Sequence, residues 1–228
     1  MYSSISKKTL IFIPAYNESL YIKRVIKGCK KLFKNIIIID DGSKDKTSEI
    51  AGGFDDVQII KHCINCGQGT AISTGIQFFL NNTNLEYLIT IDADSQHDPS
   101  DAFKMLEYAF KNNYEVVLGS RFLANKKNAI PIRRGFALKL AILFERFFYG
   151  INLSDAHNGL RVLSREACKS LNYLYASGMA HATEIPSRLH NAGYHLNEFP
   201  CEVNYNIDKE STSIISSLNI ISDLIQKK

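Results

Sequence analysis

The chain of 228 residues contains no apolar run long enough to cross a membrane. A membrane-spanning helix needs about 20 predominantly apolar residues, and the longest candidate, 137–151, is interrupted by Lys139, Glu145 and Arg146. The first eight residues also lack the apolar core of a signal peptide. We therefore expect a cytoplasmic protein. Any contact with a membrane would be peripheral, at the inner face of the plasma membrane.

The chain also lacks a disulfide framework and a strong excess of charge. Its five cysteines are odd in number and scattered. Cys63 and Cys66 have the spacing of half a zinc ribbon, but no second pair follows, so reduced thiols are the preferred interpretation. The net charge of +4, from 27 Lys and Arg against 23 Asp and Glu, is too small to indicate nucleic acid binding.

What the chain does contain is enough apolar material for a globular core. Hydrophobic residues make up 45% of the sequence, and a chain of this length buries roughly 70% of its unfolded surface, so that neither disulfides nor structural metal are needed. Length predicts one large domain or one domain with an appendage. We expect a single domain over 1–210 and a C-terminal amphipathic helix over 211–228.

Short apolar runs alternate with amphipathic segments along the first half of the chain. Runs of β-branched residues are typical of strands that are buried on both faces, as in a parallel sheet. The expected strands cover 10–13, 36–39, 57–61, 87–91, 116–118, 160–163 and, with a break at Pro200, 195–205. The expected helices cover 18–33, 70–80, 99–111, 130–149, 182–191 and a segment that begins at 164. This alternation predicts an α/β fold with a mainly parallel central sheet.

Polar residues follow four of the predicted strands. The clusters are 16–18, 40–41, 92–98 and Arg121. Turn formation explains one such cluster easily, but it explains four clusters at successive strand ends poorly. Because ligands bind beyond the carboxyl ends of the strands in α/β sheets, we expect the functional site at this edge.

The most informative of these clusters carries two carboxylates, Asp92 and Asp94, with Gln96 and Asp98 beside them. Two carboxylates one residue apart at the end of a buried strand are suited to share a hard divalent cation. Oxygen ligands favour Mg²⁺ or Mn²⁺, which usually bridge to the phosphates of a substrate. Such an ion stabilises the charge that develops on a leaving nucleotide. An Asp-x-Asp pattern alone is weak evidence, and its position after a strand raises its value.

Several motifs occur together in one order and resemble those of family 2 glycosyltransferases of the GT-A fold. The chain is similar to the dolichyl- and undecaprenyl-phosphate hexosyltransferases of that family over roughly residues 9–205. The matching segments are FIPAYNE at 12–18, IDDGSKDKT at 39–47, NCGQGTA at 65–71, DADSQHDP at 92–99, GSRF at 119–122 and DAHNGLRVLSR at 155–165. The resemblance implies sugar transfer from a nucleotide sugar.

The resemblance implies a donor site and a metal site. The nucleotide sugar would be bound by Pro14, Tyr16, Glu18, Asp41, Gly67, Gln68 and Asp92. Asp41 would accept a hydrogen bond from the base, which suits the N–H of uracil or guanine and therefore a UDP- or GDP-linked donor. The metal, Mg²⁺ or Mn²⁺, would be held by Asp92, Asp94 and Gln96. Arg121 would face phosphate, because its planar fork of donors matches phosphate oxygens.

On the acceptor side, the resemblance points to Asp155, and the catalytic candidates are Asp94, Arg121 and Asp155. A hydroxyl acceptor needs a general base, which contributes about 10²–10⁴-fold. A phosphate acceptor is already an anion and needs little or no base, so that Asp155 would position the acceptor or the metal instead. Further acceptor-side candidates are Arg133, Arg134, Arg161 and Glu184.

Three positions depart from the family pattern. Gln68 stands where Lys or Leu is common, Ser95 where Gly is common, and 204–206 where the lipid-phosphate enzymes often carry an Arg. The last departure weakens the lipid-phosphate assignment more than the glycosyltransferase assignment. His97, His157 and His181 lie near the motifs, and each is open to a role in the site or to a structural role.

The segment 130–149 combines cations with aromatic residues. It fits a helix packed on the domain, or a helix at a membrane surface with its cations on anionic headgroups. The apolar stripe after 213 fits packing on the domain, on a second subunit in a homo-oligomer, or on a bilayer. The sequence leaves these alternatives open.

Three functions follow from these observations. The first is metal-dependent, inverting transfer of a sugar to a polyprenyl phosphate. The second is transfer by an enzyme of the same family to a hydroxyl of a glycan or lipid-linked saccharide. The third, a nucleotidyltransferase-like enzyme, would use the same acidic pair for a different phosphate reaction.

Overall fold

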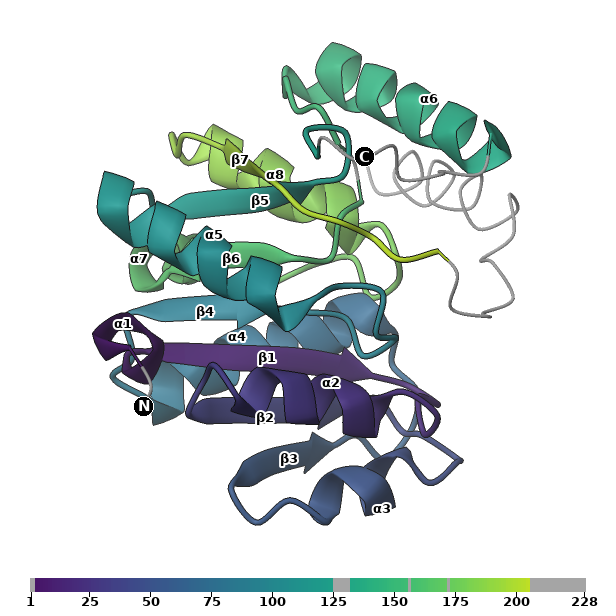
Figure 1. Ribbon diagram of the computed structural model, residues 1–228. Coiled ribbons are helices and arrows are strands. Elements are labelled where there is room, and N and C mark those ends of the chain that lie inside the picture. Colours follow the sequence, from purple (N-terminus) through teal and green to yellow (C-terminus); the bar gives the residue numbers. More distant parts are fainter. Residues whose placement is uncertain (1–2, 125–131, 156, 172, 206–228) are drawn as a thin grey trace.

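The computed structural model describes residues 3–124, 132–155, 157–171 and 173–205, without the side chains of 132–134 and 137. Within these residues it contains one seven-stranded sheet with helices on both faces (Figure 1). The strands are β1 (Thr9–Ala15), β2 (Asn35–Asp40), β3 (Val57–Lys61), β4 (Tyr87–Thr90), β5 (Val116–Ser120), β6 (Arg161–Ser164) and β7 (Asn197–Pro200). The helices are α1 (Ser4–Lys7), α2 (Ile22–Lys30), α3 (Thr47–Gly52), α4 (Gln68–Asn82), α5 (Pro99–Asn112), α6 (Ile132–Tyr149), α7 (Arg165–Ser170) and α8 (His181–Asn191).

The strand order is β3-β2-β1-β4-β6-β5-β7. The pairs β1–β2, β2–β3, β1–β4 and β5–β7 are parallel, whereas β6 is antiparallel to both of its neighbours. This arrangement confirms the predicted α/β fold with a mainly parallel sheet. Because β6 runs in the opposite direction, its amino end lies at the same edge as the carboxyl ends of β4 and β5.

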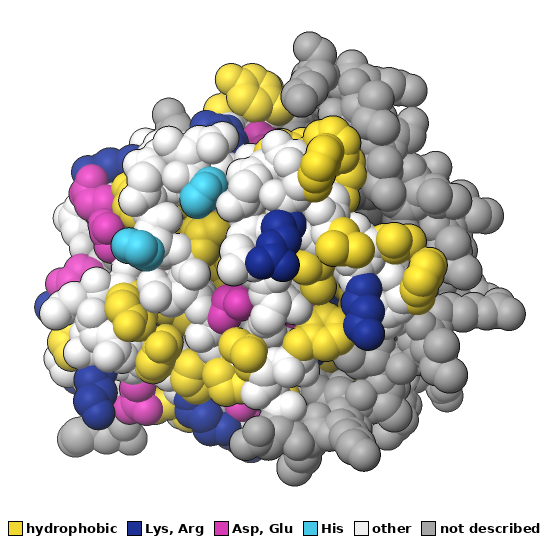
Figure 2. Space-filling view, turned by 90° about the horizontal axis from the view of Figure 1, so that it is seen from above, with side chains coloured by type: hydrophobic (Ala, Val, Ile, Leu, Met, Phe, Trp, Pro, Cys, Tyr) yellow, Lys and Arg dark blue, Asp and Glu magenta, His cyan; other side chains and the backbone are white. Residues whose placement is uncertain are grey.

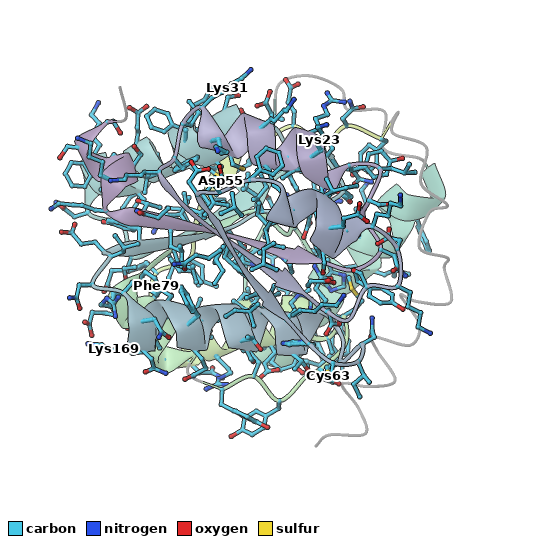
Figure 3. The ribbon with its side chains drawn as sticks, turned by 90° about the horizontal axis from the view of Figure 1, so that it is seen from below. Lys23, Lys31, Asp55, Cys63, Phe79 and Lys169 are labelled. Carbon is cyan, nitrogen blue, oxygen red and sulfur yellow. The ribbon has the colours of Figure 1, made fainter. Side chains whose placement is uncertain are left out.

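The core has two layers because successive residues of a strand point to opposite faces of the sheet. Ile11 and Ile13 of β1 pack with α2 and α5, whereas Leu10 and Phe12 pack with α4 and the helices α7 and α8. Figure 3 shows β1 between α2 on one side and α4 on the other. The strands buried on both faces are thus those that the sequence presents as continuous apolar runs.

Some predicted boundaries were wrong, for local reasons. The helix expected over 18–33 begins only at Ile22, because the loop before it donates hydrogen bonds elsewhere: the N–H of Glu18 to Thr47 Oγ1 at 2.8 Å, and the N–H of Ser19 to Asp45 Oδ2 at 3.0 Å. The short helices α1 and α3 were not predicted. The helix expected over 211–228 lies outside the described residues.

No helix among the described residues is both long and apolar enough to cross a membrane. The helix α6 nevertheless exposes a row of apolar side chains: Phe136, Leu140, Leu143, Phe147 and Phe148. Figure 2 shows hydrophobic side chains, with Lys and Arg among them, on the face of the molecule that carries this helix.

Arg165 holds the end of α4 at the edge of the sheet opposite the predicted site. Its guanidinium donates to the carbonyls of Phe79, Leu80, Thr83 and Leu85 at 2.7–3.2 Å and lies 4.5 Å from the ring centre of Phe79. The last carbonyls of a helix have no partners within the helix. Arg165 therefore serves as a cap for α4, which is a structural role.

We expect Arg165→Met to lower the free energy of unfolding by about 2–3 kcal/mol, because several carbonyls lose a charged donor at once. Urea denaturation measures this loss if the slope of the unfolding free energy against urea concentration is the same in both proteins. Lys169→Met is the matched control: its ammonium forms an exposed ion pair with Glu166, so we expect a change of less than about 1 kcal/mol. Equal effects of the two substitutions would contradict the capping role.

Candidate active site

The polar clusters meet at one edge of the sheet, where β1, β2, β4 and β5 have their carboxyl ends. The segment before β6 arrives at the same edge, since Arg161 lies opposite Thr90 of β4 and Leu118 of β5. Sequence positions far apart, such as Asp41, Asp92 and Asp155, are therefore placed around one region. This is the site that the strand-end pattern predicts.

Asp41 is buried and holds the loop 62–67. Its Oδ1 accepts from the N–H of Cys66 at 2.9 Å, and its Oδ2 accepts from the N–H of Gly67 at 2.7 Å. The same Oδ1 lies 2.7 Å from His62 Nδ1. The carboxylate thus orders the loop that leads into α4, and a contact with a nucleotide base stays a prediction.

The glycines of this loop make room for another backbone segment. A Cβ on Gly69 would lie 1.8 Å from the carbonyl oxygen of Ala176. The N–H of Gly69 donates to the carbonyl of Ser177 at 2.7 Å, which gives α4 a partner at its amino end. Glu184, an acceptor-side candidate, holds the same segment, because its two oxygens accept from the N–H groups of Tyr175 and Ala176, each at 2.8 Å.

The acidic motif follows β4. The side chain of Asp92 is 28% exposed, and its Oδ1 accepts from Gln68 Nε2 at 3.2 Å. Asp94 is partly buried and accepts from the N–H of Gln96 at 2.9 Å. Ser95, at φ 65°, has the left-handed backbone that glycine adopts most readily. This explains why glycine is suited to the position where the sequence departs from the family.

Asp92 lies against the acceptor-side segment. A Cβ on Gly159 would be 2.0 Å from Asp92 Oδ2, so that a larger residue there would displace the Asp92 carboxylate. His97 Nε2 is 3.9 Å from the same oxygen. Burial lowers the pKa of His97 to about 4, and its ring is therefore neutral near pH 7. The structure brings the donor motif and the segment 155–159 together.

Arg121 and Asp155 form a buried ion pair. Arg121 is 5% exposed and Asp155 is 4% exposed. Asp155 Oδ2 accepts from Arg121 Nε at 2.7 Å and from the N–H of Arg121 at 2.9 Å. Asp155 Oδ1 is buried without a hydrogen-bond partner. A buried carboxylate oxygen in this state has the capacity to accept a hydrogen bond from a ligand.

Two partners of this pair were not predicted from the sequence. Glu198 of β7 accepts from the N–H of Ser154 at 2.9 Å and from its hydroxyl at 2.8 Å, which fixes the residue before Asp155. The hydroxyl of Tyr205 accepts from Arg121 at 3.0 Å. Tyr205 lies in the segment where the family often has an Arg, and here its hydroxyl is a hydrogen-bond acceptor for Arg121.

Arg161 lies in a second buried polar group beside Asp155, between α6, α8 and β6. Thr183 Oγ1 donates to Glu145 Oε1 at 2.7 Å, and His157 Nε2 is 3.8 Å from the same carboxylate oxygen. Burial raises the pKa of Glu145 to about 7, against the opposing effects of the Thr183 hydrogen bond and Arg161. The role of Glu145 was not predicted, because it stands in an otherwise cationic and aromatic helix.

A cavity of about 20 Å³ adjoins this group, large enough for about one water molecule. It is lined by Leu118, Gly119, Glu145, Leu153, Asp155, His157, Asn158, Arg161, Ala182 and Pro186. Burial also lowers the pKa of His157 to about 4 and that of His181 to about 3. Both histidines are neutral in the folded protein near pH 7.

The remaining candidates are dispersed. Tyr16 is 41% exposed just beyond β1, and Pro14 is buried within that strand opposite Ile39. The side chains of Arg133 and Arg134 lie outside the described residues. Their assignment to the acceptor stays a prediction from the sequence.

Comparison with known proteins decides the family. The model of glycosyl transferase family 2 matches residues 10–171. The chain belongs to this family. Because its members are glycosyltransferases, membership favours this activity over the nucleotidyltransferase-like alternative.

Related proteins cover most of this glycosyltransferase. An uncharacterised protein of Methanocaldococcus jannaschii is 33% identical over 96% of this chain and 91% of its own length. The UDP-N-acetylglucosamine–dolichyl-phosphate N-acetylglucosaminyltransferase of Methanococcus voltae is 32% identical over 73% of both chains. The polyprenol monophosphomannose synthase of Mycolicibacterium smegmatis is 28% identical over 86% of this chain and 77% of its own.

The fold is also that of solved glycosyltransferases. Glucosyl-3-phosphoglycerate synthase from Mycobacterium tuberculosis, solved with Mn²⁺, UDP-glucose and glycerol 3-phosphate, superposes with a TM-score of 0.67 at 17% identity. The match covers 96% of this glycosyltransferase and 79% of that chain. The predicted GT-A fold is thereby confirmed.

We expect Glu145 to make the stability of this glycosyltransferase depend on pH. Its pKa is about 7 when folded, against an ordinary value of 4.5, so the folded protein holds the proton more tightly than the unfolded chain does. The stabilisation is present below pH 4.5 and is lost as the pH rises to about 7. Relative to Glu145→Gln, the wild type should lose up to about 3 kcal/mol across this range.

Urea denaturation of both proteins at a series of pH values measures the difference. The buried histidines act in the opposite direction, because their lowered pKa values cost stability as the pH falls. Both proteins contain these histidines, so their contributions largely cancel. A difference that stays constant with pH would contradict the raised pKa of Glu145.

Proposed function

We propose that this glycosyltransferase moves a sugar from a nucleoside diphosphate sugar to a polyprenyl phosphate, with inversion at the anomeric carbon and with a divalent metal. The observation that carries the proposal is the contact between two halves of the site. Asp92, at the end of β4, lies directly against Gly159, in the segment that begins with Asp155. A donor held at the acidic motif and an acceptor held beside Asp155 would therefore be neighbours.

The residues after β4 fit a hard divalent cation. Asp92 and Asp94 offer carboxylate oxygens that are not fully buried, and Mg²⁺ typically takes one or two protein carboxylates together with substrate phosphates and water. Gln96 would complete this group, while Gln68 orients Asp92. When bound, the ion would stabilise the negative charge of the departing nucleoside diphosphate. The structure of the Mycobacterium tuberculosis synthase with Mn²⁺ and UDP-glucose supports this assignment by its shared fold.

The donor base would lie near Asp41, on the other side of the loop 62–67. Asp41 Oδ2 accepts one hydrogen bond within the chain, from Gly67, and a carboxylate oxygen can accept a second one. An N–H of uracil or guanine suits that oxygen. Tyr16, which is exposed just beyond β1, and Glu18 would also contact the nucleotide.

Two observations favour a polyprenyl phosphate as the acceptor. The relatives from Methanococcus voltae and Mycolicibacterium smegmatis are named for dolichyl phosphate and polyprenol. The helix α6 exposes large apolar side chains beside Lys139 and Arg146, which suits contact with the surface of an anionic membrane. A lipid acceptor would then reach the site from the membrane to which the enzyme binds peripherally.

In this reaction, an oxygen of the acceptor phosphate attacks the anomeric carbon while the bond to the nucleoside diphosphate breaks. The phosphate is an anion, so no proton has to be removed. Arg121 is already paired with Asp155, and we assign it to orienting that carboxylate beside the acceptor. Arg161 is buried at the same place and would offset the charge of an acceptor phosphate.

A hydroxyl acceptor is the second candidate, and one observation favours it. Asp155 Oδ1 is buried without a hydrogen-bond partner. A general base needs such an oxygen to accept the proton of a hydroxyl group. In this alternative, Asp155 would take the proton of the acceptor hydroxyl as the new glycosidic bond forms.

We expect Asp94→Ala to lower kcat/KM for sugar transfer by about 10²-fold or more, because charge stabilisation at the leaving group is lost. The assay combines the purified protein, Mn²⁺, a panel of UDP- and GDP-sugars and a polyprenyl phosphate, with the glycolipid detected by mass spectrometry. Asp55→Ala is the matched control, since Asp55 is exposed and precedes β3, at the edge of the sheet opposite the site. Transfer by Asp94→Ala at the wild-type rate would overturn the metal assignment.

We expect the effect of Asp155→Asn to depend on the acceptor. With a polyprenyl phosphate, transfer should fall less than about tenfold, because no base is needed. With a hydroxyl acceptor, the loss should be about 10²–10⁴-fold. The ratio of the two rates in one preparation is the measurement, because partial unfolding lowers both rates equally. Equal losses with the two acceptors would count against the role proposed for Asp155.

A further inference from the structure

A second group of side chains that could ligate a metal ion lies at the loop 62–67, apart from the acidic motif. Asp41, His62 and Cys66 each place one ligand atom within 4.8 Å of those of the other two. The group comes from three places in the chain: the end of β2, the residue after β3, and the residue before the turn into α4. It combines a carboxylate, an imidazole and a thiol.

This mixture of ligands selects a different ion from the one expected at Asp92 and Asp94. Mg²⁺ and Mn²⁺ prefer oxygen, whereas thiol and imidazole ligands favour Zn²⁺ and similar ions. Zinc bonds are about 2.3 Å to sulfur and about 2.0–2.2 Å to nitrogen and oxygen. Atoms around such an ion are about 3–4 Å apart, so small side-chain rotations would bring the three atoms to these distances.

The surrounding contacts already orient the histidine and the carboxylate. His62 Nε2 lies 3.0 Å from Thr74 Oγ1, and the hydroxyl of Thr74 donates to the carbonyl of Thr70 at 3.1 Å. The ring therefore directs Nδ1 at Asp41 Oδ1, which is 2.7 Å away. A hydrogen-bonded outer partner of this kind is typical of histidines that bind metal.

The group also has an open side. Cys66 is partly exposed, and Cys63 is exposed three residues before it. This is the Cys-x-x-Cys spacing found in zinc sites, although the rest of a zinc ribbon is missing from the sequence. Solvent water or Cys63 can supply the fourth ligand of a tetrahedral ion.

We propose that Asp41, His62 and Cys66 form a binding site for a thiophilic divalent cation of the zinc class, separate from the Mg²⁺ or Mn²⁺ site of the transfer reaction. A bound ion would tie β2, β3 and the amino end of α4 together. It would also bind the Asp41 carboxylate, which we propose accepts a hydrogen bond from the donor base. That consequence rests on the proposed function, whereas metal binding itself does not.

The test is a titration of the full chain with Co²⁺, in the presence of excess Mg²⁺, a phosphine reductant and no nucleotide. We expect one equivalent of Co²⁺ to produce the absorption band of a cobalt–thiolate bond, and one equivalent of Zn²⁺ to remove it. Cys66→Ser should abolish the band if water is the fourth ligand and at least halve it if Cys63 is, and His62→Gln should abolish tight binding. Thr74→Val should weaken zinc binding by about 10–100-fold, measured by competition with a chromogenic chelator.

His195→Gln is the matched control, because this exposed histidine lies outside the group, and it should bind as the wild type does. Thermal melts without metal establish that each variant is folded, and Zn²⁺ should raise the melting temperature of the wild type and not that of Cys66→Ser. No cobalt–thiolate band in the wild type, or an equal band in Cys66→Ser, would overturn the proposal. Since no donor or acceptor is present, neither result bears on sugar transfer.

Discussion

The buried ion pair between Arg121 and Asp155 is the interaction on which the acceptor half of the site depends. It joins the end of β5 to the segment before β6, two places that are 34 residues apart in the chain. Both side chains are almost fully buried, and removing one partner of such a pair typically costs about 3–5 kcal/mol because the other charge stays buried. Glu198 and Tyr205 extend the pair to β7 and the residues after it. Three distant segments thereby share one arrangement around Asp155.

The donor half is built differently, from carboxylates that bind backbone N–H groups. Asp41 holds the loop 62–67, and Glu184 holds the segment 175–176 that packs against Gly69. These contacts bring the loop 62–67 and the segment 175–176 to the amino end of α4, and Arg188 pairs with Glu184 at 3.4 Å. The acidic residues of the motifs therefore have two tasks: some order the loops, and others, such as Asp92, remain partly exposed at the edge of the sheet.

The sequence predicted the fold well because its strongest signals are local. Runs of β-branched residues such as 36–39 are typical of a strand covered on both faces, and four polar clusters at strand ends locate the site. The motifs also identify the family, which the comparisons confirm. Helix boundaries such as that of α2 were missed, because hydrogen bonds that the loop before it donates to Thr47 and Asp45, more than 20 residues away, decide where the helix begins. The roles of Glu145 and Glu198 were missed for the same reason: their partners are distant in the chain.

The sequence by itself thus determined the α/β architecture, the edge that carries the site and the residue types available there, because periodicity and motif order are properties of neighbouring residues. Only the tertiary structure decided which side chains meet. It paired Arg121 with Asp155 and placed Arg165 as a cap at the end of α4, at the opposite edge. It also brought Asp41, His62 and Cys66 together. The tertiary structure also decided protonation states, since burial away from water raises the pKa of Glu145 to about 7. Contacts and desolvation arise from segments packing across the sheet, and no local pattern in the chain encodes them.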